Sequence, residues 1–221
     1  MTWSETPKSL LNIFTNKKEG SIKEVKIETP SRPLTNGEIK LATSVFKNSI
    51  NYTTVKIFFG SFFPLKSQNE DTFVTPNGSI YIMPKHYRDD YSLEDISYKK
   101  IFLHELGHVW QHQRKLIVLA NAGALQACSV LSNFKYDPYI YNIWESPTVA
   151  EFVKYKNTTK RFLDYNLESQ AEILADYWLL KNNYDVSYML ERNRKNVVGK
   201  SRDKVLAMYE QKIRQVIKKI H

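Results

Sequence analysis

Residues 103–113 read Leu-His-Glu-Leu-Gly-His-Val-Trp-Gln-His-Gln, and this stretch decides both the fold and the chemistry that the sequence predicts. Apolar residues at helical spacing on both sides place it inside a helix. His104 and His108 are four residues apart, so on a helix both imidazoles share one face and can bind one metal ion. Glu105, between them, is the expected general base for hydrolysis.

A catalytic zinc site of this kind has three protein ligands and keeps one position open. The chain has a single cysteine, Cys128, so a site built on paired cysteines is excluded and the ligands must be histidines and carboxylates. The best source of a third ligand is residues 168–176, Glu-Ser-Gln-Ala-Glu-Ile-Leu-Ala-Asp. Ala171 and Ala175 lie on the same face of this predicted helix as its carboxylates, and they would let it approach the histidine helix closely.

Two assignments of the third ligand follow from this face. In the first, Glu168 binds the metal and Glu172 orients a ligand histidine by accepting its free N–H. In the second, Glu172 binds the metal and Asp176 lies behind it. We favour Glu168.

The composition is that of a globular protein. Hydrophobic residues make up 42% of the 221 residues and charged residues 25%, which is too apolar for intrinsic disorder. We expect no membrane span, because the longest uncharged run, residues 117–134, contains several Asn, Gln and Ser residues. The first residues lack the pattern of a Sec signal peptide, so we expect synthesis in the cytoplasm without a cleaved signal.

The net charge of +9 is unevenly distributed, since residues 181–221 carry eleven Lys and Arg against four Asp and Glu. A solvated helix surface is the simplest interpretation of this segment. The alternative is an anionic partner, such as nucleic acid, a cell-wall polymer or an acidic protein. We do not expect nucleic-acid binding, because no known nucleic-acid motif is present.

Predicted strands cluster early and predicted helices late, which indicates an α+β fold. The boundaries that we predict are an N-terminal arm over 1–33, a metallopeptidase-like domain over 34–182 and a basic helical extension over 183–221 packed on the same domain. The predicted strands are Ile22–Ile27, Thr53–Phe59, Thr72–Thr75 and Ser79–Met83, the last two forming a hairpin around Asn77-Gly78. The predicted helices begin at the capping box Thr35–Glu38 and at Ser92, with others at Ile117–Leu131, Asn166–Asn182 and Ser201–Ile220.

Two groups of motifs resemble the Vgr-related, Rhs-associated proteins of Gram-negative bacteria. The first group is Leu34–Glu38, Thr75–Gly78, Tyr87–Asp90 and Phe102–Gln113, and the second is Asp164–Ile173. The resemblance covers about two thirds of the chain, and neither the arm nor the basic extension takes part in it. The spacing Glu-x-x-Ala-x-x-x-Ala from Glu168 is also similar to the third-ligand helix of the ImmA/IrrE metallopeptidases, which supports Glu168 over Glu172.

The resemblance implies a zincin fold and a gluzincin-like site with one Zn²⁺ held by His104, His108 and Glu168. It also implies a zinc metallopeptidase linked to type VI secretion and delivered into a target cell as an antibacterial toxin. The substrate would be a protein or the peptide part of peptidoglycan, and the partners would be a secretion-spike protein and an immunity protein. The alternative is a non-catalytic spike adaptor with a structural or vestigial zinc site.

Hydrolysis also needs a hydrogen-bond donor for the oxyanion that develops on the substrate. The candidates, which the sequence does not rank, are His86, Tyr87, Tyr165 and Tyr177. In zincins an edge strand beside the active-site helix pairs with the substrate backbone, and Ser79–Met83 is our candidate for that strand.

Overall fold

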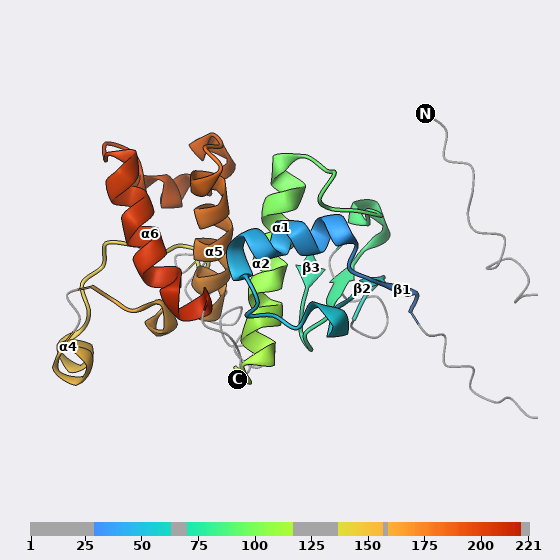
Figure 1. The fold of residues 1–221 in the computed structure, drawn as a ribbon, viewed down its shortest axis with the longest axis horizontal. Coiled ribbons are helices and arrows are strands. Elements are labelled where there is room, and N and C mark those ends of the chain that lie inside the picture. The colour runs from blue at the N-terminus through green and yellow to red at the C-terminus, as the bar shows by residue number, and fades with distance from the viewer. Residues whose placement is uncertain (1–28, 63–69, 117–136, 157–158, 218–221) are drawn as a thin grey trace, which may run out of the picture.

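The computed structural model describes residues 29–62, 70–116, 137–156 and 159–217. It has a mixed α+β fold with a small four-stranded sheet and a larger helical part, as predicted (Figure 1). The strands are β1 (Ser31–Pro33), β2 (Lys56–Phe59), β3 (Phe73–Val74) and β4 (Ile80–Ile82). The helices are α1 (Asn36–Phe46), α2 (Ile96–Gln113), α4 (Val149–Tyr155), α5 (Leu167–Lys181) and α6 (Arg202–Ile217). None of the helices described has both the length and the apolar character needed to cross a membrane.

The sheet has the order β1-β2-β4-β3, with β2 and β4 parallel and the other two pairs antiparallel. The hairpin prediction is confirmed: β3 pairs with β4, and Gly78 in the turn has the positive φ of 81° that such a turn favours. The prediction that Ser79–Met83 forms the edge strand is wrong. Because β4 pairs with β2 on one side and β3 on the other, both of its backbone edges are used.

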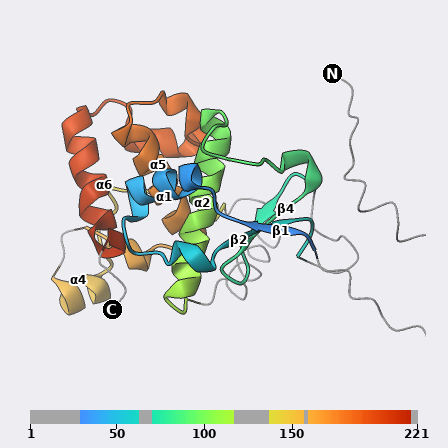
Figure 2. The same cartoon turned by 45° about the vertical axis from the view of Figure 1, so that its right-hand side comes forward.

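Helix α2 lies between the sheet and the pair of helices α5 and α6 (Figures 1 and 2). The crossing of α2 and α5 is close because Gly107 of α2 faces Ala171 of α5. A Cβ added to Gly107 would lie 2.9 Å from the Ala171 Cβ and 3.0 Å from its Cα, closer than real side chains approach. Of the two alanines predicted to permit this approach, Ala171 lies at the contact with Gly107.

The beginnings of the helices follow local capping chemistry. The capping box at Thr35 and Glu38 is confirmed at the start of α1. The prediction that Ser92 caps α2 is wrong, because the N–H and the hydroxyl of Ser92 both donate to Asp90. Asp95 is the N-cap instead, and its carboxylate accepts from the Tyr98 N–H at 3.0 Å.

The remaining predicted elements have different outcomes. The predicted strand over Thr53–Phe59 is shorter, because a 3₁₀ turn over Tyr52–Thr54 precedes β2. Helices α5 and α6 match the predicted ranges to within a few residues, and α4 was not predicted. The predictions at Ile22–Ile27 and Ile117–Leu131 lie outside the described residues.

The core continues into the basic C-terminal segment. Helix α6 contributes Val205, Tyr209, Ile213 and Val216, all buried, and it packs against α5. The hydrophobic face of α6 therefore joins the same core that surrounds α2.

We predict that Gly107→Ala lowers the free energy of unfolding by about 1–3 kcal/mol, measured by chemical denaturation. Alanine is normally the better helix former, but here its methyl group would force α2 and α5 apart. Ser97→Ala, at an exposed position of the same helix, is the control and should change stability by less than about 0.5 kcal/mol. Equal effects of the two substitutions would contradict the close crossing.

Candidate metal centre

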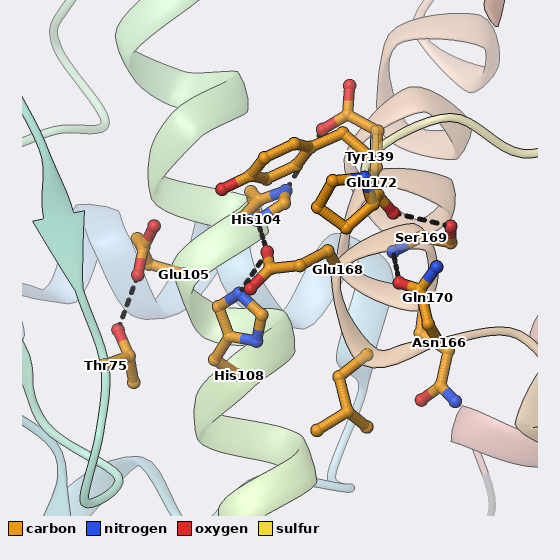
Figure 3. A network of polar contacts seen from close by, with 12 residues as sticks. Thr75, His104, Glu105, His108, Tyr139, Asn166, Glu168, Ser169, Gln170 and Glu172 are labelled. Carbon is orange, nitrogen blue, oxygen red and sulfur yellow. Dashed lines mark hydrogen bonds and ion pairs between the residues drawn. The ribbon is translucent and has the colours of Figure 1, made fainter. Parts of the chain in front are cut away.

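The buried face of α2 carries the three residues of the sequence motif. His104 and His108 are one helical turn apart, and both imidazoles lie on the side of α2 that faces α5 (Figure 3). Glu105 lies on a different side of the helix, toward the sheet. All three side chains are buried, so their charges and hydrogen bonds are poorly screened by water.

Glu168 comes from the first turn of α5 and reaches between the two histidines. Its Oε2 atom lies 3.2 Å from Nε2 of His104 and 3.1 Å from Nε2 of His108. One ligand atom from each of the three residues lies within 4.8 Å of the others. Within the part of the chain that the structure describes, this is the His and carboxylate cluster compact enough to hold one ion.

The Nδ1 atom of each imidazole makes a hydrogen bond, and this bond fixes the direction in which the Nε2 atom of the same ring points. His104 Nδ1 lies 3.0 Å from Glu172 Oε2, a carboxylate that can only accept, so Nδ1 carries the hydrogen. His108 Nδ1 lies 2.8 Å from Gln111 Oε1, while Gln111 Nε2 donates to Leu167 O at 2.8 Å. Because the Gln111 amide is oriented by that second bond, His108 Nδ1 is also a donor.

This donor set fits a metal ion. In the neutral imidazoles, both Nε2 atoms keep a lone pair aimed at the point where the Glu168 carboxylate also converges. Two imidazole nitrogens and one carboxylate oxygen are ligands that Zn²⁺ accepts, and they leave a fourth position for water or substrate. With a metal bound, Glu172 and Gln111 would be the outer groups that orient the two histidines.

The electrostatics of the metal-free site favour positive charge. Burial by itself would lower the pKa of His104, but its hydrogen bonds with Glu168 and Glu172 outweigh burial and raise that pKa to about 10. The pKa of His108 is also raised, because the Glu168 carboxylate outweighs burial. Burial would raise the pKa of Glu168, yet the two histidines hold it well below its ordinary value. Protons therefore occupy the positions that a cation would take.

A buried chain of polar groups supports His104 from behind. Glu172, which accepts from His104, also accepts from the Lys100 ammonium through its other oxygen. Lys100 Nζ lies 3.3 Å from Asp176 Oδ1, and Asp176 Oδ2 accepts from the Tyr141 hydroxyl at 2.7 Å. Burial and the nearby Glu172 charge raise the pKa of Asp176 to about 7. Asp176 thus pairs with Lys100 and accepts a hydrogen bond from Tyr141, and it does not contact His104 or His108.

Glu105 is held separately by the β3–β4 hairpin. The Thr75 hydroxyl, directly after β3, donates to Glu105 Oε2 at 2.7 Å, and both side chains are buried (Figure 3). No hydrogen bond to Glu105 Oε1 occurs among the described residues, so that oxygen is free to accept a proton.

The structure brings together His104, His108 and Glu168, and it places Glu172 on the outer nitrogen of His104. The four residues expected as oxyanion donors contact other parts of the protein. Their positions are as follows: His86 bonds Asp71 and Tyr98, Tyr87 packs against Arg32 and Phe59, Tyr165 donates to Asn142 O, and Tyr177 lies beneath Lys181. Tyr139, which we did not predict, packs on His104 with ring centroids 5.7 Å apart.

Sequence reasoning missed four residues of the site. Lys100 could have been predicted from the sequence, because it lies four residues before His104 and therefore on the same helix face. The same holds for Gln111, three residues after His108. Thr75 and Tyr139 lie in a turn and a loop, where no periodicity shows the direction of a side chain.

Comparisons with known proteins link the chain to type VI secretion. It is 36% identical over 155 residues to the "Type VI secretion system spike protein VgrG2b" of Pseudomonas aeruginosa; the match covers 69% of this chain and only 13% of the spike protein. It is also similar to the solved "Effector domain of Pseudomonas aeruginosa VgrG2b", with a TM-score of 0.60 and 30% identity over 87% of this chain and 89% of that domain. No protein-family model matches the chain.

We predict that zinc binding at pH 7 releases at least one proton per ion. The pKa of His104, raised to about 10 in the metal-free chain, means that this imidazole is protonated at pH 7 and must lose its proton to bind the metal. Affinity should therefore rise about tenfold per pH unit for each proton displaced, measured by chelator competition between pH 6 and 8. Calorimetry in two buffers of different ionisation enthalpy counts the protons, and zero released would contradict the assignment.

The pairing of Glu168 with the two histidines also predicts how the stability of the metal-free chain depends on pH. A raised histidine pKa contributes stability that is fully present below pH 6.5 and is lost as the pH rises through about 10. The lowered pKa of Glu168 contributes stability that is present above pH 4.5 and is lost as the pH falls toward its folded-state value.

A third prediction separates the two carboxylates of α5. Glu168→Ala should lose zinc under mild chelation, because its oxygen converges with both Nε2 atoms. Glu172→Ala should retain zinc with about 10–100-fold weaker affinity, because Glu172 orients one histidine. Chelator competition on both variants is the measurement. The opposite order would make Glu172 the ligand.

Proposed function

The chain belongs to the family of the VgrG2b effector domain, and from this relationship we propose that it is a zinc-dependent hydrolase that cleaves peptide bonds. The observation that carries the proposal is the convergence of both histidine Nε2 atoms on Glu168, with each outer nitrogen already bonded. His104, His108 and Glu168 would hold the ion. When bound, Zn²⁺ would supply Lewis acidity that polarises a carbonyl and makes a nearby water more acidic.

We assign the role of general base to Glu105. Thr75 holds one oxygen of its carboxylate, which fixes the side chain and leaves Oε1 as the atom that takes a proton from the attacking water. The same oxygen can then return the proton to the leaving amine. Glu105 follows His104 directly in the chain but points toward the hairpin, so it is not one of the three candidate ligands.

The competing hypothesis is a non-catalytic spike adaptor with a structural or vestigial zinc site. A closed structural zinc site uses four protein ligands. Within the described ranges the cluster offers three, and a further carboxylate, Glu105, is oriented by its own buried hydrogen bond. A purely structural site has no use for that arrangement, so catalysis is the better account.

The relationship to a spike protein supports delivery as a type VI secretion effector. We propose that the chain acts in a target cell on a protein or on the peptide part of peptidoglycan, with a spike protein as carrier and an immunity protein in the producing cell. A polar cleft of about 510 Å³ opens one turn of α2 beyond His108, between His112, Gln113 and the turn at Asn77–Ser79. Such a cleft suits a polar segment of substrate.

We predict that Glu105→Gln keeps its zinc and loses about 10²–10⁴-fold in hydrolysis, because the amide retains the hydrogen bond to Thr75 but cannot take up a proton. Hydrolysis is measured on unfolded casein and on purified peptidoglycan sacculi, and zinc by mass spectrometry. Glu191→Gln, at an exposed position, is the control and should match the wild type. Activity that survives Glu105→Gln would refute this mechanism.

Expression of the same variants in the periplasm and in the cytoplasm of a sensitive bacterium distinguishes the hydrolytic effector from the non-catalytic spike adaptor. A hydrolytic effector is toxic in the compartment that holds its substrate, and Glu105→Gln removes that toxicity. A zinc-loaded wild type that cleaves neither substrate and is toxic in neither compartment would support the adaptor.

A further inference from the structure

The side chain of Tyr139 lies at the candidate metal centre, and among the described residues it makes no hydrogen bond that would explain its position. Its ring packs against His104, with ring centroids 5.7 Å apart and the planes inclined by 39°. The residue remains 40% exposed, and its hydroxyl has no hydrogen-bond partner among the described residues. A tyrosine hydroxyl without a partner among the described residues, beside a buried polar cluster, is available to bind a ligand.

The loop that carries Tyr139 is fixed by hydrogen bonds on both sides. The Tyr139 N–H donates to Asp137 Oδ1 at 3.0 Å, and the Tyr139 carbonyl accepts from Asn193 Nδ2 at 3.1 Å. Ser169 of α5 donates to the Pro138 carbonyl at 2.8 Å. The backbone is therefore held against α5, and the ring is placed in advance rather than recruited from a free loop.

The Tyr139 ring is oriented with its hydroxyl toward the region between the candidate metal centre and Glu105. Figure 3 shows that the ring extends from the loop across His104, with its hydroxyl toward the side on which Glu105 lies. A neutral phenol is a hydrogen-bond donor, and the other hydroxyl beside Glu105, that of Thr75, already donates to Glu105 itself.

We propose that Tyr139 donates a hydrogen bond to the scissile carbonyl oxygen as that oxygen becomes negatively charged, an inference that rests on the proposed hydrolytic function. When water adds to the carbonyl carbon, the carbon–oxygen π bond breaks and its electron pair moves to the oxygen. The proton of the water goes to Glu105, and the phenolic proton stays on Tyr139. When the carbonyl re-forms, the carbon–nitrogen bond breaks and the amine leaves with the proton from Glu105.

The test uses Tyr139→Phe in the zinc-loaded full chain. Because the hydroxyl makes no bond within the described structure, its removal should leave zinc content and thermal stability unchanged. The kcat of peptide hydrolysis should fall about 10²–10³-fold with little change in KM, since the bond strengthens only in the transition state. Tyr188→Phe is the matched control, because this residue is 39% exposed and lies beyond the opposite end of α5.

A binding measurement that does not depend on hydrolysis accompanies the kinetics. Methylphosphonate, a tetrahedral oxyanion, should bind the zinc-loaded wild type and bind Tyr139→Phe about 10–100-fold more weakly, as expected for loss of a hydrogen bond to a charged group. Equal binding by both proteins, or none by the wild type, overturns the assignment. A kcat loss with unchanged methylphosphonate binding also overturns it and indicates that the hydroxyl acts through His104. If no peptide is cleaved but Tyr139→Phe binds methylphosphonate more weakly, the donor role stands and the hydrolytic assignment fails.

Discussion

The pairing of one buried carboxylate with two buried histidines is the constraint on which the rest of this structure depends. Glu168 lies within 3.2 Å of both His104 and His108; the two histidines are buried, and the Glu168 side chain is only 13% exposed. Buried polar and charged groups are costly unless each is paired and hydrogen-bonded. That requirement accounts for Glu172 and Gln111 on the outer nitrogens and for Lys100 beneath Glu172. A cation at this point would satisfy the same requirement.

The helix crossing makes this pairing possible, and the fold is arranged around it. Gly107 faces Ala171 on the neighbouring helix, which brings α2 and α5 close enough for a short carboxylate side chain to bridge them. The support continues outward from Lys100 through Asp176 and Tyr141 to Tyr209 of α6, whose hydroxyl lies 2.6 Å from that of Tyr141. The basic C-terminal segment therefore contributes a buried helix face to the support of a candidate metal ligand.

The sequence predicted the features that depend on helical spacing. His104 and His108 at four residues, Glu168 one turn before Glu172, and the small residues between the helices all follow from a period of 3.6. Sheet order could not be predicted, because nothing in Ser79–Met83 shows that β2 would pair with its outer edge. The place of Tyr139 beside His104 could not be predicted for a related reason, because its loop is held by Ser169 and Asn193, which bond the Pro138 and Tyr139 carbonyls and are distant in sequence.

The central claim is that His104, His108 and Glu168 bind zinc together. Zinc K-edge X-ray absorption of the loaded full chain tests it most directly, because the spectrum reports the identity and distance of the ligand atoms. The account predicts two imidazoles at about 2.0–2.1 Å, further oxygen ligands at about 2.0–2.2 Å and no sulfur. Loss of the imidazole signal in His104→Ala/His108→Ala would agree with it. A spectrum of the wild type with sulfur at about 2.3 Å, or with oxygen ligands alone, would contradict it.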